Sequence, residues 1–124
     1  MADDRQDRAL GLLLQLRHLE ALTAAREAQV AAARVAAVGQ QIAGLDERVL
    51  TEATALRDYA DAGALGRWAD AMDGKRAGLV RLMAGEERRA SQLAARATAA
   101  NRVEEQHREL LGDHRRRLAD QRRR

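Results

Sequence analysis

The sequence of 124 residues contains no cysteine, no proline and no phenylalanine, and it has one tryptophan and one tyrosine. Without cysteine, the chain has no disulfide framework, no thiolate nucleophile and no zinc site with cysteine ligands. Without proline, no position forbids a continuous helix. A compact enzyme core is usually filled with aromatic and branched side chains. Their scarcity argues against an ordinary globular enzyme.

Alanine and leucine dominate instead, at 28 and 17 positions, and 33% of the residues are charged. This composition predicts long helices. Gly63 and Gly66 lie close together near the midpoint, and glycine readily ends a helix because it adopts the left-handed conformation. We therefore expect one helix over about residues 4–60, a turn over about 61–65 and a second helix over about 66–121.

An apolar repeat with a mean spacing of 3.5 residues, the pattern of a coiled-coil seam, runs along both predicted helices. In the first helix it is apolar except at Arg17 and Glu52: Leu10, Leu14, Arg17, Ala21, Ala24, Ala28, Ala31, Val35, Val38, Ile42, Leu45, Val49, Glu52, Leu56 and Tyr59. In the second helix five of its positions are polar: Leu65, Ala69, Met72, Arg76, Leu79, Met83, Glu86, Ala90, Leu93, Ala97, Ala100, Glu104, His107, Leu111, His114 and Leu118.

The predicted fold is therefore all-α, a long antiparallel two-helix coiled-coil hairpin that forms a single rod-shaped domain over residues 1–124. A parallel dimer of single helices is disfavoured, because the central glycines would then have no purpose. Polar seam residues are expected to set the register rather than the strength of the pairing.

Several leucines near the N-terminus lie outside this repeat: Leu12, Leu13, Leu16, Leu19 and Leu22. They widen the apolar face, so we expect a third helix or another protein to pack there. The run at residues 12–14 is too short for a membrane span or the core of a signal peptide, because Gln15 and Arg17 interrupt it. We expect a soluble, cytoplasmic protein with no membrane insertion.

Motifs for catalysis or cofactors are weak. Glu104 and His107 have the spacing of a di-iron helical bundle, but that site needs a second copy of the motif, and the sequence has none. His107 and His114 then remain as seam histidines with no assigned role. No phosphate-binding or dinucleotide-binding glycine motif is present. The sequence predicts no enzyme, no cofactor and no metal.

The last twelve residues hold six arginines and two aspartates. Their net charge of +4 exceeds the formal net charge of +3 of the whole chain. These arginines are Arg115, Arg116, Arg117, Arg122, Arg123 and Arg124. They could complement the dipole at the end of a helix, dock into an acidic protein cavity or contact nucleic acid phosphates. Nucleic acid is disfavoured because no aromatic side chain accompanies them.

The only tryptophan, Trp68, shares a helical stripe with Met72 and Leu79 just past the predicted turn. Two interpretations stay open. These side chains either cover the hairpin core at its tip or form a surface for a partner, since tryptophan and methionine are enriched in interfaces.

Several segments together resemble the flagellar FliJ proteins and their counterparts in type III secretion. The segments are LQLRHLE at residues 14–20, the alanine-rich repeat, Arg67 and Trp68 after the midpoint, and VEEQHRELL at residues 103–111 before the arginines. The resemblance covers nearly the whole chain as an architecture with loose motifs.

The resemblance implies a stalk, peripheral to the inner-membrane export apparatus, that inserts the end bearing both termini into the export ATPase ring. It further implies contact with the membrane protein of the export gate, and help in recycling export chaperones. The six arginines above would face the ring, and Trp68, Met72 and Leu79 would contact the gate, although Lys75 departs from the family's stripe. The alternative is a homodimeric helical-bundle adaptor, or a nucleic-acid-binding protein that uses the basic C-terminal end.

Overall fold

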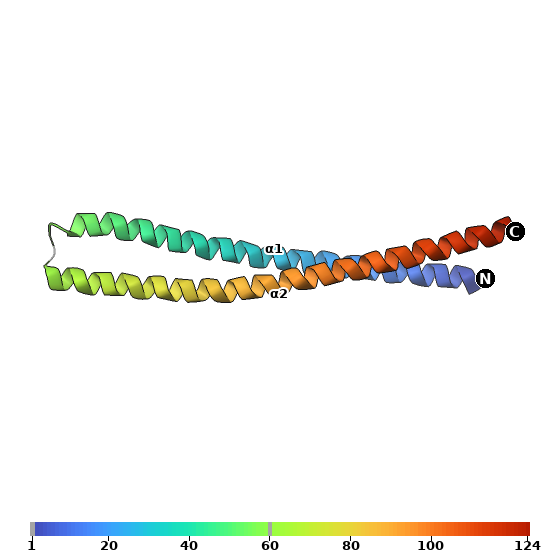
Figure 1. Cartoon of the computed structure of the whole chain (residues 1–124), viewed down its shortest axis with the longest axis horizontal. Helices are drawn as coiled ribbons and strands as arrows, with labels where there is room; N and C mark the ends of the chain where they lie inside the picture. Colours follow the sequence, from blue (N-terminus) through green and yellow to red (C-terminus); the bar gives the residue numbers. More distant parts are fainter. Residues whose placement is uncertain (1, 60) are drawn as a thin grey trace. The chain divides into compact units, whose positions relative to one another are not determined.

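The computed structural model describes residues 2–59 and 61–124, and they form two helices (Figure 1). Helix α1 spans Ala2–Leu56 and helix α2 spans Ala62–Arg123. The two helices run antiparallel and pack against each other, and the described residues contain no strand. The predicted all-α two-helix hairpin is confirmed.

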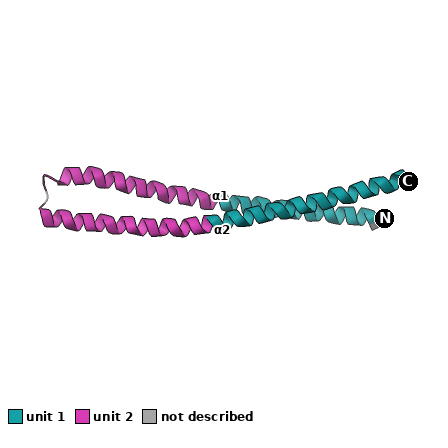
Figure 2. Cartoon of the chain, in the orientation of Figure 1, with its two compact units in different colours: residues 1–29, 91–124 teal, residues 30–90 magenta. Residues whose placement is uncertain are grey.

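The chain divides into two compact units, each built from one segment of α1 and one of α2 (Figure 2). Unit 1 comprises residues 1–29 and 91–124, and unit 2 comprises residues 30–90. Both ends of the chain therefore belong to unit 1, and the connection between the helices belongs to unit 2. The expectation of a single domain over residues 1–124 stays a prediction.

The predicted repeat identifies the contact face of each helix. Every predicted seam position of α1 from Leu10 to Leu56 is buried or half-buried, and Ala31, Val38 and Leu45 are the most enclosed. On α2 every predicted position except Arg76 is buried or half-buried. Tyr59, the last position predicted on the first helix, lies outside α1 and is 90% exposed. It is not part of the seam.

Contacts between the helices follow one register in both units. In unit 1, Asp7 pairs with Arg115 and His18 with Glu104. In unit 2, Asp46 pairs with Arg76, and a Cβ added at Gly39 would lie 3.3 Å from Cε of Met83. The two members of each pair are equally far along the chain from Asp61. Residues at equal separations before and after Asp61 therefore lie opposite each other on the two helices.

Arg76 was expected in the seam but is exposed, because it reaches across to a carboxylate on the surface of α1. Its Nε donates to Oδ1 of Asp46 at 2.9 Å and its Nη2 donates to Oδ2 at 3.3 Å. This hydrogen bond, together with the negative charge of Asp46, raises the pKa of Arg76 above its ordinary value. The pair joins the two helices of unit 2 at their surface, in the same register as the other contacts.

The predicted position of the turn, residues 61–65 with glycine ending the first helix, is wrong. Helix α1 already ends at Leu56, and the amide of Tyr59 donates to the carbonyl of Leu56. Helix α2 begins directly after Asp61, whose Oδ1 accepts from the amide of Ala64 at 2.6 Å. An aspartate at this position satisfies an amide that the first turn leaves unpaired. No glycine of the described residues has a positive φ, so Gly63 and Gly66 are ordinary helical residues.

Replacing Gly66 by alanine should therefore stabilise the protein. Gly66 is helical and a Cβ there would meet no atom within 4 Å, so Gly66→Ala gains about 0.5–1 kcal/mol in the free energy of unfolding. Urea denaturation measures this change. A loss of stability in Gly66→Ala would mean that the glycine forms the turn after all.

Asp61→Ala should lower the free energy of unfolding by about 1 kcal/mol because it removes the cap, whereas Asp61→Asn should keep it.

Candidate docking surfaces

The six C-terminal arginines are all exposed in unit 1; five belong to α2, and Arg124 follows its last residue. Arg115 donates from Nε to Oδ1 of Asp7 at 3.2 Å, and Arg116 pairs with Asp113 on its own helix. The other four make no ion pair with any residue that the structure describes: Arg117, Arg122, Arg123 and Arg124. Unit 1 thus ends in a cluster of guanidinium groups that are free to bind an anion.

Acidic residues of α1 lie close to this cluster. Nε2 of His114 is 3.5 Å from the carbonyl oxygen of Asp3, which places the first turn of α1 beside α2. Asp3 and Asp4 there complement the positive dipole end of α1, as the arginines complement the negative end of α2. The arginines outnumber these acids, so an acidic surface is the partner that the charges favour.

A polar contact joins the helices of unit 1 between a buried glutamate and an exposed histidine. Glu104 is 5% exposed, and its Oε1 accepts a hydrogen bond from Nδ1 of His18. Its Oε2 lies 3.5 Å from Nη2 of Arg108. An unpaired carboxylate in this position would cost several kcal/mol, because it loses water without gaining a partner. Arg108 belongs to the same helix as Glu104, so of these two partners only His18 depends on the register of the two helices.

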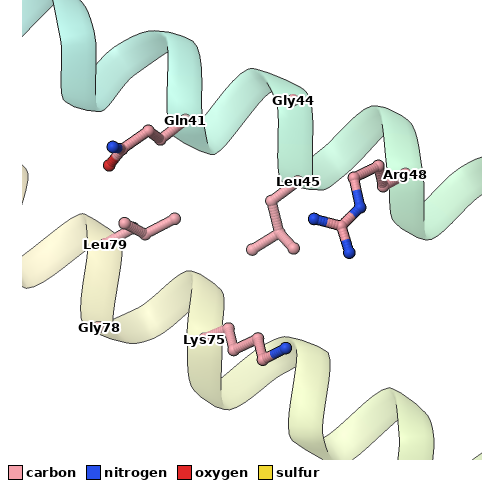
Figure 3. Close-up of a pocket in the computed structure, with 7 residues that line it drawn as sticks. All are labelled: Gln41, Gly44, Leu45, Arg48, Lys75, Gly78 and Leu79. Carbon is pink, nitrogen blue, oxygen red and sulfur yellow. The ribbon is translucent and has the colours of Figure 1, made fainter.

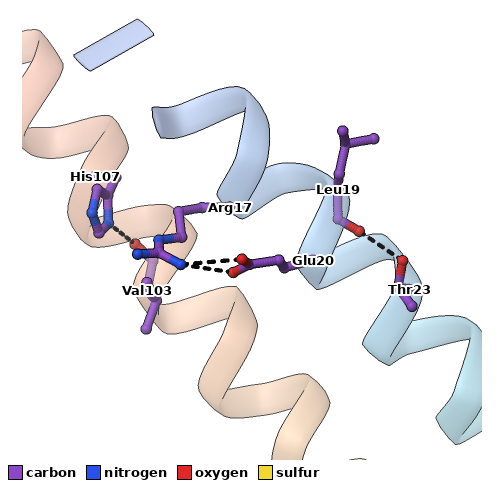
Figure 4. A network of polar contacts seen from close by, with 6 residues as sticks. All are labelled: Arg17, Leu19, Glu20, Thr23, Val103 and His107. Atoms are coloured by element: carbon purple, nitrogen blue, oxygen red, sulfur yellow. Dashed lines mark hydrogen bonds and ion pairs between the residues drawn. The ribbon is translucent and has the colours of Figure 1, made fainter. Parts of the chain in front are cut away.

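Neighbouring polar side chains find partners on their own helices (Figure 4). Arg17 donates to Glu20 at 2.9 Å, and Nδ1 of His107 donates to the carbonyl oxygen of Val103 at 2.8 Å. Glu104 therefore contacts His18, whereas His107 contacts the backbone of its own helix. The two residues of the di-iron motif do not point toward a common metal site. Among the residues described, no group of three His, Cys, Asp or Glu side chains could hold a metal ion.

The pairing of His18 with Glu104 is the contact that the sequence reasoning missed. His18 lies outside the apolar repeat, so the repeat gave it no place in the seam. The signal that could have found it is symmetry. In a hairpin centred on residue 61, residue 18 faces residue 104, and an acid in the seam needs a donor on the facing helix.

The stripe of Trp68, Met72 and Leu79 in unit 2 is partly covered by the contact between the helices. Trp68, Met72 and Leu79 are half-buried, and Met72 and Leu79 occupy seam positions, whereas Lys75 is exposed. The three residues proposed for the gate therefore share one side of α2 with the helix contact. Each leaves only part of its surface for a partner.

An open groove of about 580 Å³ lies between the helices of unit 2 (Figure 3). Gly44 and Gly78 occupy paired positions on the two helices, and a Cβ at either would meet no atom within 4 Å. The groove exists because two facing positions lack side chains. It has apolar walls from Leu45 and Leu79 and basic side chains at its edge; its full lining is Gln41, Gly44, Leu45, Arg48, Lys75, Gly78 and Leu79.

Comparisons with protein-family models, curated proteins and solved structures found no match to this chain. Neither helix, over its described length, has a stretch that is both long and apolar enough to cross a membrane. The assignment of a partner to either surface therefore depends on the chemistry of the surface and on the resemblance noted above.

The contact between His18 and Glu104 should be measurable as a coupling energy. A double-mutant cycle with His18→Gln and Glu104→Gln should give about 1 kcal/mol in the free energy of unfolding, because the carboxylate is buried. The same cycle with Asp46→Asn and Arg76→Gln is the control. It should give less, about 0.5 kcal/mol, because both partners are exposed. No coupling between residues 18 and 104 would contradict the register assigned to unit 1.

Proposed function

We propose that the protein is a non-enzymatic helical stalk of a flagellar or type III protein export apparatus. In this proposal the basic end of unit 1 enters the ring of the export ATPase, and unit 2 contacts the membrane protein of the export gate. The observation that carries the proposal is the cluster of exposed arginines at the end of α2, four of which have no acidic partner among the described residues.

Several physical features support the ring contact. Guanidinium groups pair with carboxylates in a bidentate geometry and remain charged at all relevant pH values. An acidic cavity attracts such a cluster over about 8–10 Å at physiological salt. Both ends of the chain belong to unit 1. The positive charge of the arginines therefore lies at the end of a pair of helices, which is narrow in cross-section.

The gate contact is proposed for the side of unit 2 that holds Trp68, Met72 and Leu79. The groove supports it, because Leu79 and the exposed Lys75 both line this recess. A partner segment with an apolar side chain and a carboxylate would match the two. Export chaperones are proposed as further partners on the resemblance alone.

Nucleic acid binding by the same arginines is the second candidate. The observation in its favour is their exposure, which suits phosphate groups as well as carboxylates. Against it, Trp68 and Tyr59, the only aromatic residues of the chain, both belong to unit 2. Bases would therefore find no stacking partner beside the arginines.

Reversing the charge of the terminal arginines should weaken the effect on the ATPase. The wild-type protein should increase hydrolysis by, or assembly of, a flagellar export ATPase. Arg122→Glu/Arg123→Glu/Arg124→Glu should weaken that effect at least about tenfold, because each reversal turns an attraction into a repulsion. Titrating ATP hydrolysis with each variant measures the change.

The matched control is Arg81→Glu/Arg88→Glu/Arg89→Glu, which makes the same charge change at exposed sites of α2 in unit 2. It should behave as the wild type. A wild-type protein that neither binds nor stimulates the ATPase would remove the proposal. Binding to DNA or RNA that falls steeply with salt and disappears when residues 115–124 are deleted would favour the second candidate.

A further inference from the structure

The groove of unit 2 lies within a regular row of small residues on one side of the seam. Such residues recur every seven positions on both helices: Ala37, Gly44 and Thr51 on α1, and Ala71, Gly78 and Gly85 on α2. Each member on α1 is as far from Asp61 as one member on α2, so the small residues face each other in pairs. The recess between Gly44 and Gly78 (Figure 3) belongs to the middle pair.

Longer side chains border this row, again in pairs across the two helices. The pairs are Arg34 with Arg89, Gln41 with Leu82, and Arg48 with Lys75. All six residues are exposed, and Leu82 has 48% of its surface free. Two of the three pairs place a cation beside a cation, where paired helices commonly place opposite charges. Like charges at this position repel each other.

Carboxylates of unit 2 do little to neutralise these four cations. Three of them make no ion pair with any residue that the structure describes. The fourth, Arg48, has its Nη2 at 3.8 Å from Oε1 of Glu52. Glu52 and Glu86, the acids of the seam that border the row, are half-buried. Exposed acids lie across the seam on the opposite side of unit 2: Asp46, Asp70, Asp73 and Glu87.

The pattern matches a third helix lying along the row. A helix that packs between two others meets their side chains at heptad spacing, which is the spacing of the small residues. Small residues allow helix axes to approach closely. Leu45 and Leu79 offer apolar walls in the recess, and carboxylates on the arriving helix would lie between the paired cations and relieve their repulsion.

We propose that the groove of unit 2 binds a partner helix that has apolar side chains on one face and carboxylates along both edges of that face. The pair Arg34 and Arg89 lies two heptads from the pair Arg48 and Lys75, about 21 Å along a helix. A partner helix of about three heptads therefore reaches both pairs. This proposal describes the chemistry of the partner at the gate-contacting side of unit 2, so it rests on the proposed function.

Binding of a designed acidic helix to the full chain tests the groove. The probe is a fluorescent peptide of about three heptads with leucine at positions a and d and glutamate at e and g, so that its charges oppose self-pairing. The wild type should bind this peptide less tightly as salt rises, and should not bind the same peptide with lysine in place of glutamate. Arg48→Glu/Lys75→Glu should weaken binding at least about tenfold. Fluorescence anisotropy measures the dissociation constants.

Two further variants separate the shape of the groove from its charge. Gly44→Leu/Gly78→Leu fills the recess, since a Cβ at either position meets no atom within 4 Å. It should weaken binding at least about tenfold and stay helical by circular dichroism, because leucine favours a helix more than glycine does. The matched charge control is Arg81→Glu/Arg88→Glu, at exposed positions of α2 outside the row and its border, and it should bind as the wild type does.

A wild type that does not bind the acidic peptide, or binds the lysine peptide equally well, would overturn the proposal. An Arg48→Glu/Lys75→Glu variant that binds as tightly as the wild type would also overturn it. ATP hydrolysis by the export ATPase reports separately on the proposed ring contact, and the groove variants should stimulate it as the wild type does. Stimulation without peptide binding would overturn the groove proposal alone, and peptide binding without stimulation would overturn the ring contact alone.

Discussion

A pair of helices can bury only one stripe of each helix, and the other features of this protein depend on that constraint. The stripe must return every 3.5 residues to face its partner. Small side chains suffice to fill it, and Ala31, at 2% exposed, is among the most enclosed residues. The shortage of aromatic residues is therefore a property of the fold.

The same constraint limits the partners that Glu104 can find. Glu104 has a single neighbouring helix from which to draw a cross-helix partner, so a slip of the pairing would leave its carboxylate without His18. Apolar residues at 3.5-residue spacing tolerate a shift by a whole heptad far better, since a heptad returns a similar side chain to the seam. Glu104 adds little strength but discriminates between registers.

The sequence predicted the helices and their contact faces, because periodicity reports directly which residues a helix buries. It misplaced the connection, because Gly63 and Gly66 predict a turn, whereas the helix start depends on Asp61. The side chain of that aspartate caps α2 and decides where the helix begins. The pairing of His18 with Glu104 was out of reach of periodicity, which treats each helix separately. The sequence predicted the basic C-terminal end. What its arginines bind depends on a second molecule, which the sequence of one chain does not describe.

The most direct test of this account is a distance measurement between spin labels on the two helices. The chain has no cysteine, so labels can be placed cleanly at Asp7→Cys/Arg115→Cys in unit 1 and at Asp46→Cys/Arg76→Cys in unit 2. Helices in contact have axes about 8–10 Å apart. The account predicts a single short distance for both pairs, unchanged when labelled chains are diluted with unlabelled ones. A long distance for either pair, or a short one that disappears on dilution, would contradict a hairpin centred on Asp61.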